Sequence, residues 1–251
     1  MPRGPQVHVA IAETRPGDDL CALASAAELA SLGRRPAEDL LAAATARALM
    51  RSLVAGPLGH DIAGLELRAR PPERPRLDAQ LPPIGLDANI SHTRHHSAAA
   101  VAYGCRVAVD VEVVAAVAGL EREIATATER ARLAALPTEG RLLEFARLWT
   151  AKEALLKLTG DGLSVEPHEV EFDGDIVTAA PPRLRAALGA QQLRVIRIPA
   201  PAGTVATVAV LGAATATITA HDPTNLLPPP PATLRKVPPR SSQPPARRGR
   251  G

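Results

Sequence analysis

Alternating apolar residues open the chain and predict a β-strand. Val7, Val9 and Ile11 alternate with smaller or polar residues, the pattern of a strand with one buried face. Two Ala- and Leu-rich segments then predict helices over about 19–32 and 36–54, with Pro36 at the first turn of the second helix, where proline is tolerated. The Pro- and Arg-rich segment 70–83 is predicted to be irregular.

From residue 88 the pattern changes to strands, predicted over 88–92, 97–103 and 105–113. A helical region follows over about 119–159, interrupted at Pro137; Thr138 is a candidate cap for its second helix and Gly160 a candidate terminator. Asp173-Gly174 predicts a hairpin, and strands are expected over 193–198 and 204–211. Helices and strands in each half of the chain predict an α+β fold.

The segment VAVDVEV combines a buried and an acidic face. Its valines occupy the odd positions 107–113, whereas Asp110 and Glu112 share the other face with Ala108. Two carboxylates at this spacing lie within roughly 7 Å and repel each other unless a cation or a proton intervenes. Oxygen ligands of this kind suit magnesium, although a solvated edge strand carrying two acids is also common.

The segment 145–162 predicts a helix with one apolar stripe, formed by Phe145, Leu148, Trp149, Leu155 and Leu156. Lys152 falls inside the stripe, where an ammonium group is costly unless it reaches water or an anion. Glu153 and Lys157 lie one turn apart at its edge. The simpler interpretation is a Glu–Lys pair at i,i+4 with Lys152 extending to solvent.

A third polar segment is ANISHTRHHS, residues 88–97. His92, His95 and His96 do not have the partners of a zinc site. A Ser91-His92 pair at a strand end, next to a turn with free backbone N–H groups, is equally suited to phosphate. Surface histidines without a function remain an alternative for His95 and His96.

Composition indicates what the core consists of and where the folded part of the chain ends. The chain has 251 residues, of which 46% are hydrophobic but only 2% aromatic, so the core is expected to consist of Ala, Leu and Val. Past Asp222 the chain has nine of its 25 prolines and six of its 29 Lys and Arg residues, and no acid. This segment is predicted to be a disordered tail.

Without the six basic residues of the tail, 23 basic residues face 26 acidic ones, which argues against a nucleic-acid-binding domain. Cys21 and Cys105 stand far apart and no apolar leader segment precedes residue 15; both observations favour the cytoplasm. The nearly uncharged stretch 203–220 is interpreted as a buried strand and its continuation rather than a membrane span.

In order and spacing the three polar segments resemble the Sfp-type 4′-phosphopantetheinyl transferases. The matching residues are Asn89-Ile90-Ser91-His92-Thr93, Ala108-Val109-Asp110-Val111-Glu112 and the run from Trp149 to Lys157, which reads WTAKEALLK. The resemblance covers about residues 35–212. It implies a monomer with the 4′-phosphopantetheinyl transferase fold. Its parts would be a coenzyme A-side half (1–105), a pseudo-symmetric half with the metal site (106–222) and the tail (223–251).

The resemblance also implies the chemistry: transfer of 4′-phosphopantetheine from coenzyme A to a serine of an acyl or peptidyl carrier protein, releasing 3′,5′-ADP. Such enzymes act in secondary metabolite biosynthesis, without nucleic acid or membrane partners. Magnesium would be held by Asp110, Glu112 and Glu153, with Glu153 as general base and Lys157 on the pyrophosphate. The residues implied in coenzyme A binding are Arg51, Arg74, Pro75, Ser91, His92, Asp110, Lys152 and Lys157.

Three positions depart from the family pattern on the nucleotide side. Ala42 replaces an arginine of the helix that carries Arg51, Glu73 replaces a glycine before Arg74-Pro75, and Ala108 replaces the glycine before the acidic pair. Two alternatives therefore stand beside the transferase. One is a degenerate family member that binds coenzyme A or a carrier protein without catalysis, and the other is a different magnesium-dependent phosphoryl-transfer enzyme.

Overall fold

The computed structural model describes residues 4–14, 36–59, 66–68, 76–78, 85–160 and 165–226. The predicted helix over 19–32 and the Arg74-Pro75 segment lie outside these ranges. The strands are β1 (Gln6–Glu13), β2 (Glu66–Arg68), β3 (Arg76–Asp78), β4 (Leu86–His92), β5 (His96–Tyr103), β6 (Arg106–Val113), β7 (Glu171–Asp173), β8 (Ile176–Ala179), β9 (Leu193–Ile198), β10 (Thr204–Leu211) and β11 (Thr217–His221).

The α-helices are α2 (Ala37–Ala55), α3 (Glu121–Ile124), α4 (Ala127–Ala134), α5 (Thr138–Thr159) and α6 (Pro182–Leu188). The short 3₁₀ turns within the described residues are η2 (Val114–Val117), η4 (Pro167–Glu169) and η5 (Pro223–Asn225). The α+β prediction is confirmed. One local expectation was wrong, because part of segment 70–83 is the strand β3, which pairs antiparallel with β2.

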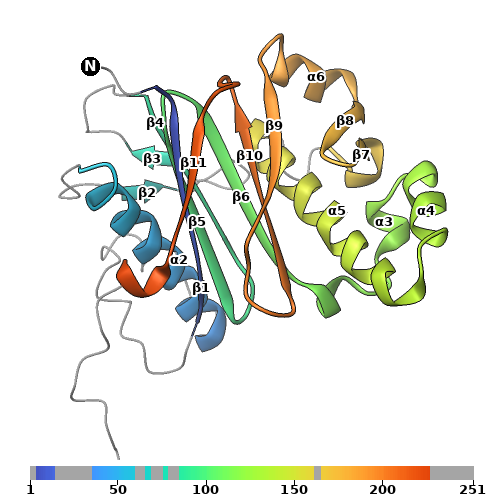
Figure 1. The fold of residues 1–251 in the computed structure, drawn as a ribbon, viewed down its shortest axis with the longest axis horizontal. Helices are drawn as coiled ribbons and strands as arrows, with labels where there is room; N and C mark the ends of the chain where they lie inside the picture. The colour runs from blue at the N-terminus through green and yellow to red at the C-terminus, as the bar shows by residue number, and fades with distance from the viewer. Residues whose placement is uncertain are drawn as a thin grey trace, which may run out of the picture.

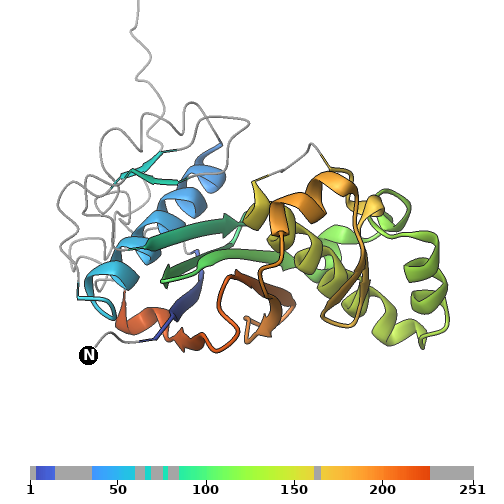
Figure 2. The ribbon, with the colours of Figure 1, turned by 90° about the horizontal axis from the view of Figure 1, so that it is seen from above.

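Four layers make up the centre of the molecule (Figures 1 and 2). One sheet has the strand order β11-β1-β5-β4 and the other has the order β6-β10-β9. The two sheets pack face to face, with α2 on the outer face of the first and α5 on the outer face of the second. The helices α3 and α4 and the β7–β8 hairpin extend beyond α5 at one end (Figure 2).

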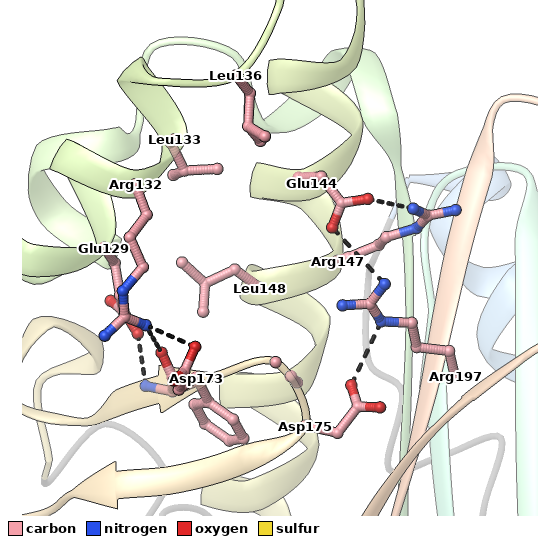
Figure 3. A pocket seen from close by; sticks show the side chains of 13 residues that line it. Glu129, Arg132, Leu133, Leu136, Glu144, Arg147, Leu148, Asp173, Asp175 and Arg197 are labelled. Atoms are coloured by element: carbon pink, nitrogen blue, oxygen red, sulfur yellow. Dashed lines mark hydrogen bonds and ion pairs between the residues drawn. The ribbon is translucent and has the colours of Figure 1, made fainter.

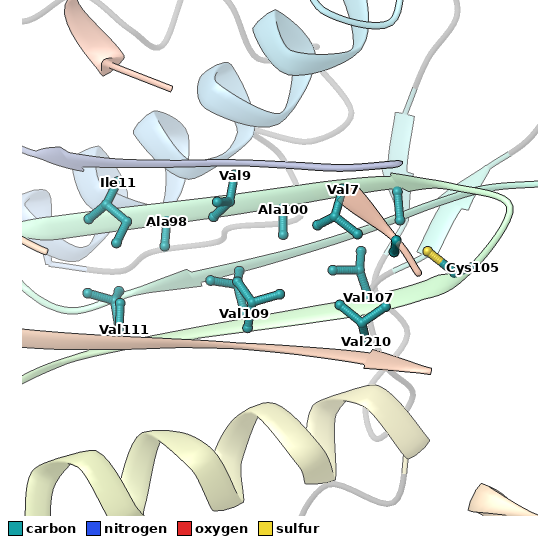
Figure 4. Close-up of a cluster of buried hydrophobic side chains, with 14 of the residues drawn as sticks. Val7, Val9, Ile11, Ala98, Ala100, Cys105, Val107, Val109, Val111 and Val210 are labelled. Carbon is teal, nitrogen blue, oxygen red and sulfur yellow. The ribbon is translucent and has the colours of Figure 1, made fainter. Parts of the chain in front are cut away.

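Small aliphatic side chains fill the space between the sheets (Figure 4). Val7, Val9 and Ile11 of β1 face Val107, Val109 and other apolar residues of the second sheet. All four of those valines have no exposed surface. The predicted alternation of β6 is thus confirmed, and a core poor in aromatic residues is closed by short side chains from both sheets.

The two halves repeat one arrangement. In the first, β1 leads to α2 and then to β4 and β5, giving the order β1-β5-β4; in the second, β6 leads to α5 and then to β9 and β10, giving β6-β10-β9. In each half the first strand pairs with the last, and the long helix covers the outer face. This internal repeat matches the pseudo-symmetry that the family resemblance implied.

The end of the described chain returns to the first half. Strand β11 pairs in parallel with β1, with Val7 opposite Ile218, so residues 217–221 complete the first sheet. The next residues form η5, and Leu226 packs on the cluster between α2 and the first sheet. The first four residues of the predicted tail, 223–226, are therefore ordered, and residues 227–251 lie outside the described ranges.

Three helix ends around α5 differ in how they are capped. Thr126 and Glu129 form a reciprocal capping box at the start of α4. The predicted cap Thr138 is wrong: Thr138 is the first helical residue of α5, Pro137 is at the N-cap position, and no side chain caps this end. Gly160 ends α5 as predicted, in the left-handed conformation with φ 83°.

A histidine pair joins β1 to β11. His8 Nδ1 and His221 Nε2 are 2.8 Å apart, a hydrogen bond that needs one ring to donate and the other to accept. Burial, then the neighbouring His221, lowers the pKa of His8 from the usual 6.5. Burial also lowers the pKa of His221.

We expect this pair to destabilise the fold in acid. Because folding lowers both pKa values, the unfolded chain binds more protons below pH 6.5, and the free energy of unfolding falls as the pH decreases. The contribution is fully present above that pH. Urea unfolding from about pH 8 to about pH 5 would show it. His221→Gln should weaken the dependence, and an unchanged pH slope in that variant would contradict this prediction.

Among the described residues, no helix combines the length and the apolar character needed to cross a membrane. The uncharged stretch 203–220 instead contains the predicted buried strand β10, followed by most of β11, which is a separate strand of the other sheet. Strand β10 is the middle strand of the second sheet and is buried along nearly its whole length.

Candidate active site

The acidic pair of β6 faces α5. Asp110 is 2% exposed and Glu112 is half-buried, while the flanking Val109 and Val111 point into the space between the sheets. Ala108, on the same face as the acids, packs against Ala154 and Leu158 of α5. A small side chain at position 108 thus lets α5 approach the strand that carries both carboxylates.

Helix α5 brings a lysine and a third acid to this face. The ammonium of Lys157 donates a hydrogen bond to Asp110 Oδ1 at 2.5 Å and another to Ser91 Oγ at 3.0 Å. The Ser91 hydroxyl in turn donates to Asp110 Oδ1 at 2.8 Å. Glu153 lies one turn before Lys157, and its ionisation is affected by the charges of both Lys157 and Asp110. Residues from β4, β6 and α5 therefore meet in one group, which we call the acidic cluster: Ser91, Asp110, Glu112, Glu153 and Lys157.

Electrostatics in the acidic cluster favour an added positive charge. Burial, then the nearby Asp110, raises the pKa of Glu112 to about 7, although Lys157 opposes the rise. Burial also raises the pKa of Glu153, again opposed by Lys157. Burial alone would lower the pKa of Lys157, but Asp110 and Glu153 outweigh it and raise the pKa. Lys157 is therefore a stable cation. The positive charge of Lys157 does not offset the burial of Glu112 and Glu153, whose pKa values stay raised.

The donor set suits a magnesium ion in charge and chemistry. Asp110 Oδ2 is buried and, within the described ranges, has no hydrogen-bond partner, whereas buried carboxylate oxygens are normally satisfied. A hard oxygen-binding cation would satisfy this atom and relieve the repulsion between the acids. Across the described residues, however, no three histidine, cysteine or acidic side chains are grouped closely enough to hold a metal ion. The ammonium of Lys157 is the cation that contacts Asp110 here.

Lys152 does not belong to the acidic cluster, although the resemblance implied that it contacts coenzyme A. Its side chain has no exposed surface, and its ammonium donates to Glu129 Oε2 at 2.6 Å, Ile124 O at 2.9 Å and Pro167 O at 3.0 Å. Three acceptors satisfy all three N–H bonds. The expected extension to solvent is therefore wrong, and the role in coenzyme A binding stays a prediction: in these contacts Lys152 joins α3, α4 and η4 to α5.

Strand alternation separates Ser91 from its neighbour His92. Ser91 points toward β6, whereas His92 pairs across the ladder with Ser97, whose hydroxyl donates to Ala42 O of α2. Residues opposite each other in a ladder share a face, so His92 lies on the α2 side. Arg51 is also buried on α2. The predicted coenzyme A residues are thus divided between the two faces of the first sheet, and Arg74 and Pro75 lie outside the described residues.

A separate cavity of about 240 Å³ lies between α4, α5 and the β7–β8 hairpin. Figure 3 shows its apolar base, which includes Leu133, Leu136 and Leu148, and a rim of charged residues. Arg197 at the rim pairs with Glu144 and Asp175, and Arg132 pairs with Asp173. The lining contains no residue of the acidic cluster, so this cavity is distinct from the candidate active site.

Sequence analysis did not assign the interactions of two residues near α5. Trp149 packs on an apolar cluster, as its place in the apolar stripe predicted, and its side chain also lowers the pKa of Glu112 slightly against the effect of burial. Glu129, the buried partner of Lys152, was not singled out. The capping-box pattern of Thr126 and Glu129 was a signal for Glu129, since it places that side chain at a helix start.

Two comparisons with known proteins cover the part of the chain that carries most of the acidic cluster. Residues 106–209 match the family described as the 4′-phosphopantetheinyl transferase superfamily. The matched region contains Asp110, Glu112, Glu153 and Lys157, so residues 106–209 are similar to the superfamily that the sequence motifs predicted. The 4′-phosphopantetheinyl transferase HetI of Nostoc sp. is 32% identical over 158 residues, which are 61% of this chain and 66% of the relative. The similarity thus spans just under two thirds of that relative's length.

Proposed function

We propose that this protein transfers 4′-phosphopantetheine from coenzyme A to a serine of an acyl or peptidyl carrier protein. The observation that supports this most directly is the acidic cluster, in which a strand and a helix bring three carboxylates to one lysine. The superfamily match and the similarity to a named transferase support the same reaction. Coenzyme A is the second substrate.

In the proposed reaction the carrier serine oxygen attacks the β-phosphorus of coenzyme A. The new bond joins serine to phosphorus, the bond to the bridging oxygen breaks, and 3′,5′-ADP leaves with the electron pair. We infer that Glu153 accepts the serine proton, because it is the carboxylate that α5 brings to the acidic cluster beside Lys157 and Asp110. Lys157 stays protonated and would neutralise charge on the leaving group.

We propose Asp110, Glu112 and Glu153 as the magnesium ligands. When bound, the ion would neutralise phosphate charge and align the two substrates. The unsatisfied Oδ2 of Asp110 and the raised pKa values of both glutamates support this assignment.

We place the pyrophosphate and the 3′-phosphate of coenzyme A on opposite faces of β4. Ser91 faces the acidic cluster, which suits a role near the pyrophosphate. His92 and Arg51 share the α2 side, which suits the 3′-phosphate. The proposed binding path would therefore pass the end of β4, where the Ser91-His92 pair changes face.

Mass spectrometry of apo-carrier proteins tests the proposal. Carrier proteins from fatty-acid, polyketide and peptide synthesis would each be incubated with the protein, coenzyme A and magnesium. We expect at least one of them to gain the mass of phosphopantetheine, and the gain to disappear with EDTA. Coenzyme A binding without a gain of mass on any carrier protein would indicate a binding module instead.

A further inference from the structure

A line of polar side chains on β4 joins the two sheets. Asp87 Oδ2 accepts a hydrogen bond from the Val107 backbone N–H at 2.8 Å, and Asn89 Oδ1 accepts one from the Val109 N–H at 3.0 Å. Strands β4 and β6 belong to different sheets. Side chains of one strand thus satisfy backbone donors of the other, and we call this row the β4–β6 seam.

The seam has the two-residue period of a strand. Asp87, Asn89 and Ser91 lie on one face of β4, while the alternate residues Ala88 and Ile90 pack toward α2. The first two members bind the β6 backbone, and the third, Ser91, donates to the Asp110 side chain at 2.8 Å. The seam therefore continues directly into the acidic cluster.

Of the two seam residues that bind the β6 backbone, Asn89 is the one nearer to the acidic cluster. It is 1% exposed, and its acceptor Oδ1 holds the amide of Val109, the residue before Asp110. A buried backbone N–H needs a partner, so this bond favours one position of β6 relative to β4. That position also decides whether Asp110 Oδ1 meets Ser91 and Lys157.

We propose that Asn89 is a positioning residue of the active site. By holding the Val109 amide, it sets the place of Asp110 relative to Ser91 and Lys157 without contacting either substrate. The inference rests on the proposed function for its catalytic consequence. Asp87 makes the same kind of bond two residues farther from the cluster and provides a matched control.

The test compares Asn89→Ala, Asn89→Asp and Asp87→Ala with the unmodified protein. Each alanine change removes one hydrogen bond between a β4 side chain and the β6 backbone, so both should lower the melting temperature by a few degrees. We expect Asn89→Ala to lower kcat about 10- to 100-fold, because small displacements of catalytic groups are costly. Asp87→Ala should keep kcat within about twofold.

Asn89→Asp keeps an acceptor oxygen in the same place and should restore most of kcat. Binding of coenzyme A and magnesium can be measured from the increase in melting temperature that it causes. This measurement does not need turnover. Asn89→Ala should reduce that shift, and Asp87→Ala should not. If Asn89→Ala does not fold, the same comparison is made with Asn89→Ser and Asp87→Ser.

Equal losses of kcat in the two alanine variants would overturn the proposal, because both bonds would then act only through stability. An unchanged kcat in Asn89→Ala would also overturn it. Failure of the unmodified protein to modify any carrier protein would instead contradict the proposed function. In that case the ligand-induced melting shifts still test the seam by themselves.

Discussion

Asp110→Ala is expected to lower transfer to carrier protein at least about a hundredfold, at saturating magnesium and coenzyme A. The change removes a proposed metal ligand and the acceptor shared by Ser91 and Lys157. A metal ion contributes several kcal/mol of charge stabilisation, and about 2.7 kcal/mol corresponds to a hundredfold in rate. The turnover number, measured from the release of 3′,5′-ADP, would show the loss.

Asp110→Asn is the matched control for this prediction. The amide keeps an oxygen for the Ser91 and Lys157 hydrogen bonds but removes the negative charge. Low activity in both variants, with far-UV spectra like that of the unmodified protein, would identify the charge as the essential property. Activity above half that of the unmodified protein in either variant would contradict the assignment of Asp110.

Lys152→Met is expected to have the largest effect on stability. It would leave the Glu129 carboxylate, 3% exposed, without the ammonium that binds it at 2.6 Å. Breaking a buried ion pair on one side typically costs about 3–5 kcal/mol, because the remaining charge stays buried. Urea unfolding would measure the loss, with little change expected in the denaturant dependence.

The double variant Lys152→Met/Glu129→Gln separates the pair from the packing around it. Without either charge, and with the amide of Gln still able to accept from the Phe172 N–H as Glu129 Oε1 does, most of the lost stability should return. A loss below about 1 kcal/mol in Lys152→Met would contradict the buried-pair assignment. A double variant that is no more stable than Lys152→Met would also contradict it.

The two lysines of the WTAKEALLK segment show why residue type alone did not assign roles. Both are lysines of α5, five positions apart, and the family resemblance implied a coenzyme A contact for each. Lys157 faces β6 and donates to Asp110, whereas Lys152 faces α3, α4 and η4. About 100° per residue places five positions on different sides of a helix, but only the packed neighbours show which side meets the acids.

The secondary structure was predictable where the periodicity was strong. Strands β9 and β10 have the predicted bounds, and β6 buries its valines and presents its acids to α5 as expected. The sequence did not predict β3, which is a three-residue strand in a Pro- and Arg-rich segment. Nor did it predict that β11 pairs with β1, since the two strands come from opposite ends of the chain.

By itself, the sequence determined the local order: which residues alternate on a strand, which share a helical stripe, and that Asp110 and Glu112 lie on one face. These properties follow from the two-residue and 3.6-residue periods of the backbone. Only the tertiary structure decided which faces meet. Asp110 meets Ser91 across 19 residues and Lys157 across 47, and Lys152 meets Glu129 across 23. Such contacts depend on how whole strands and helices pack, because no local period relates residues so far apart in the chain.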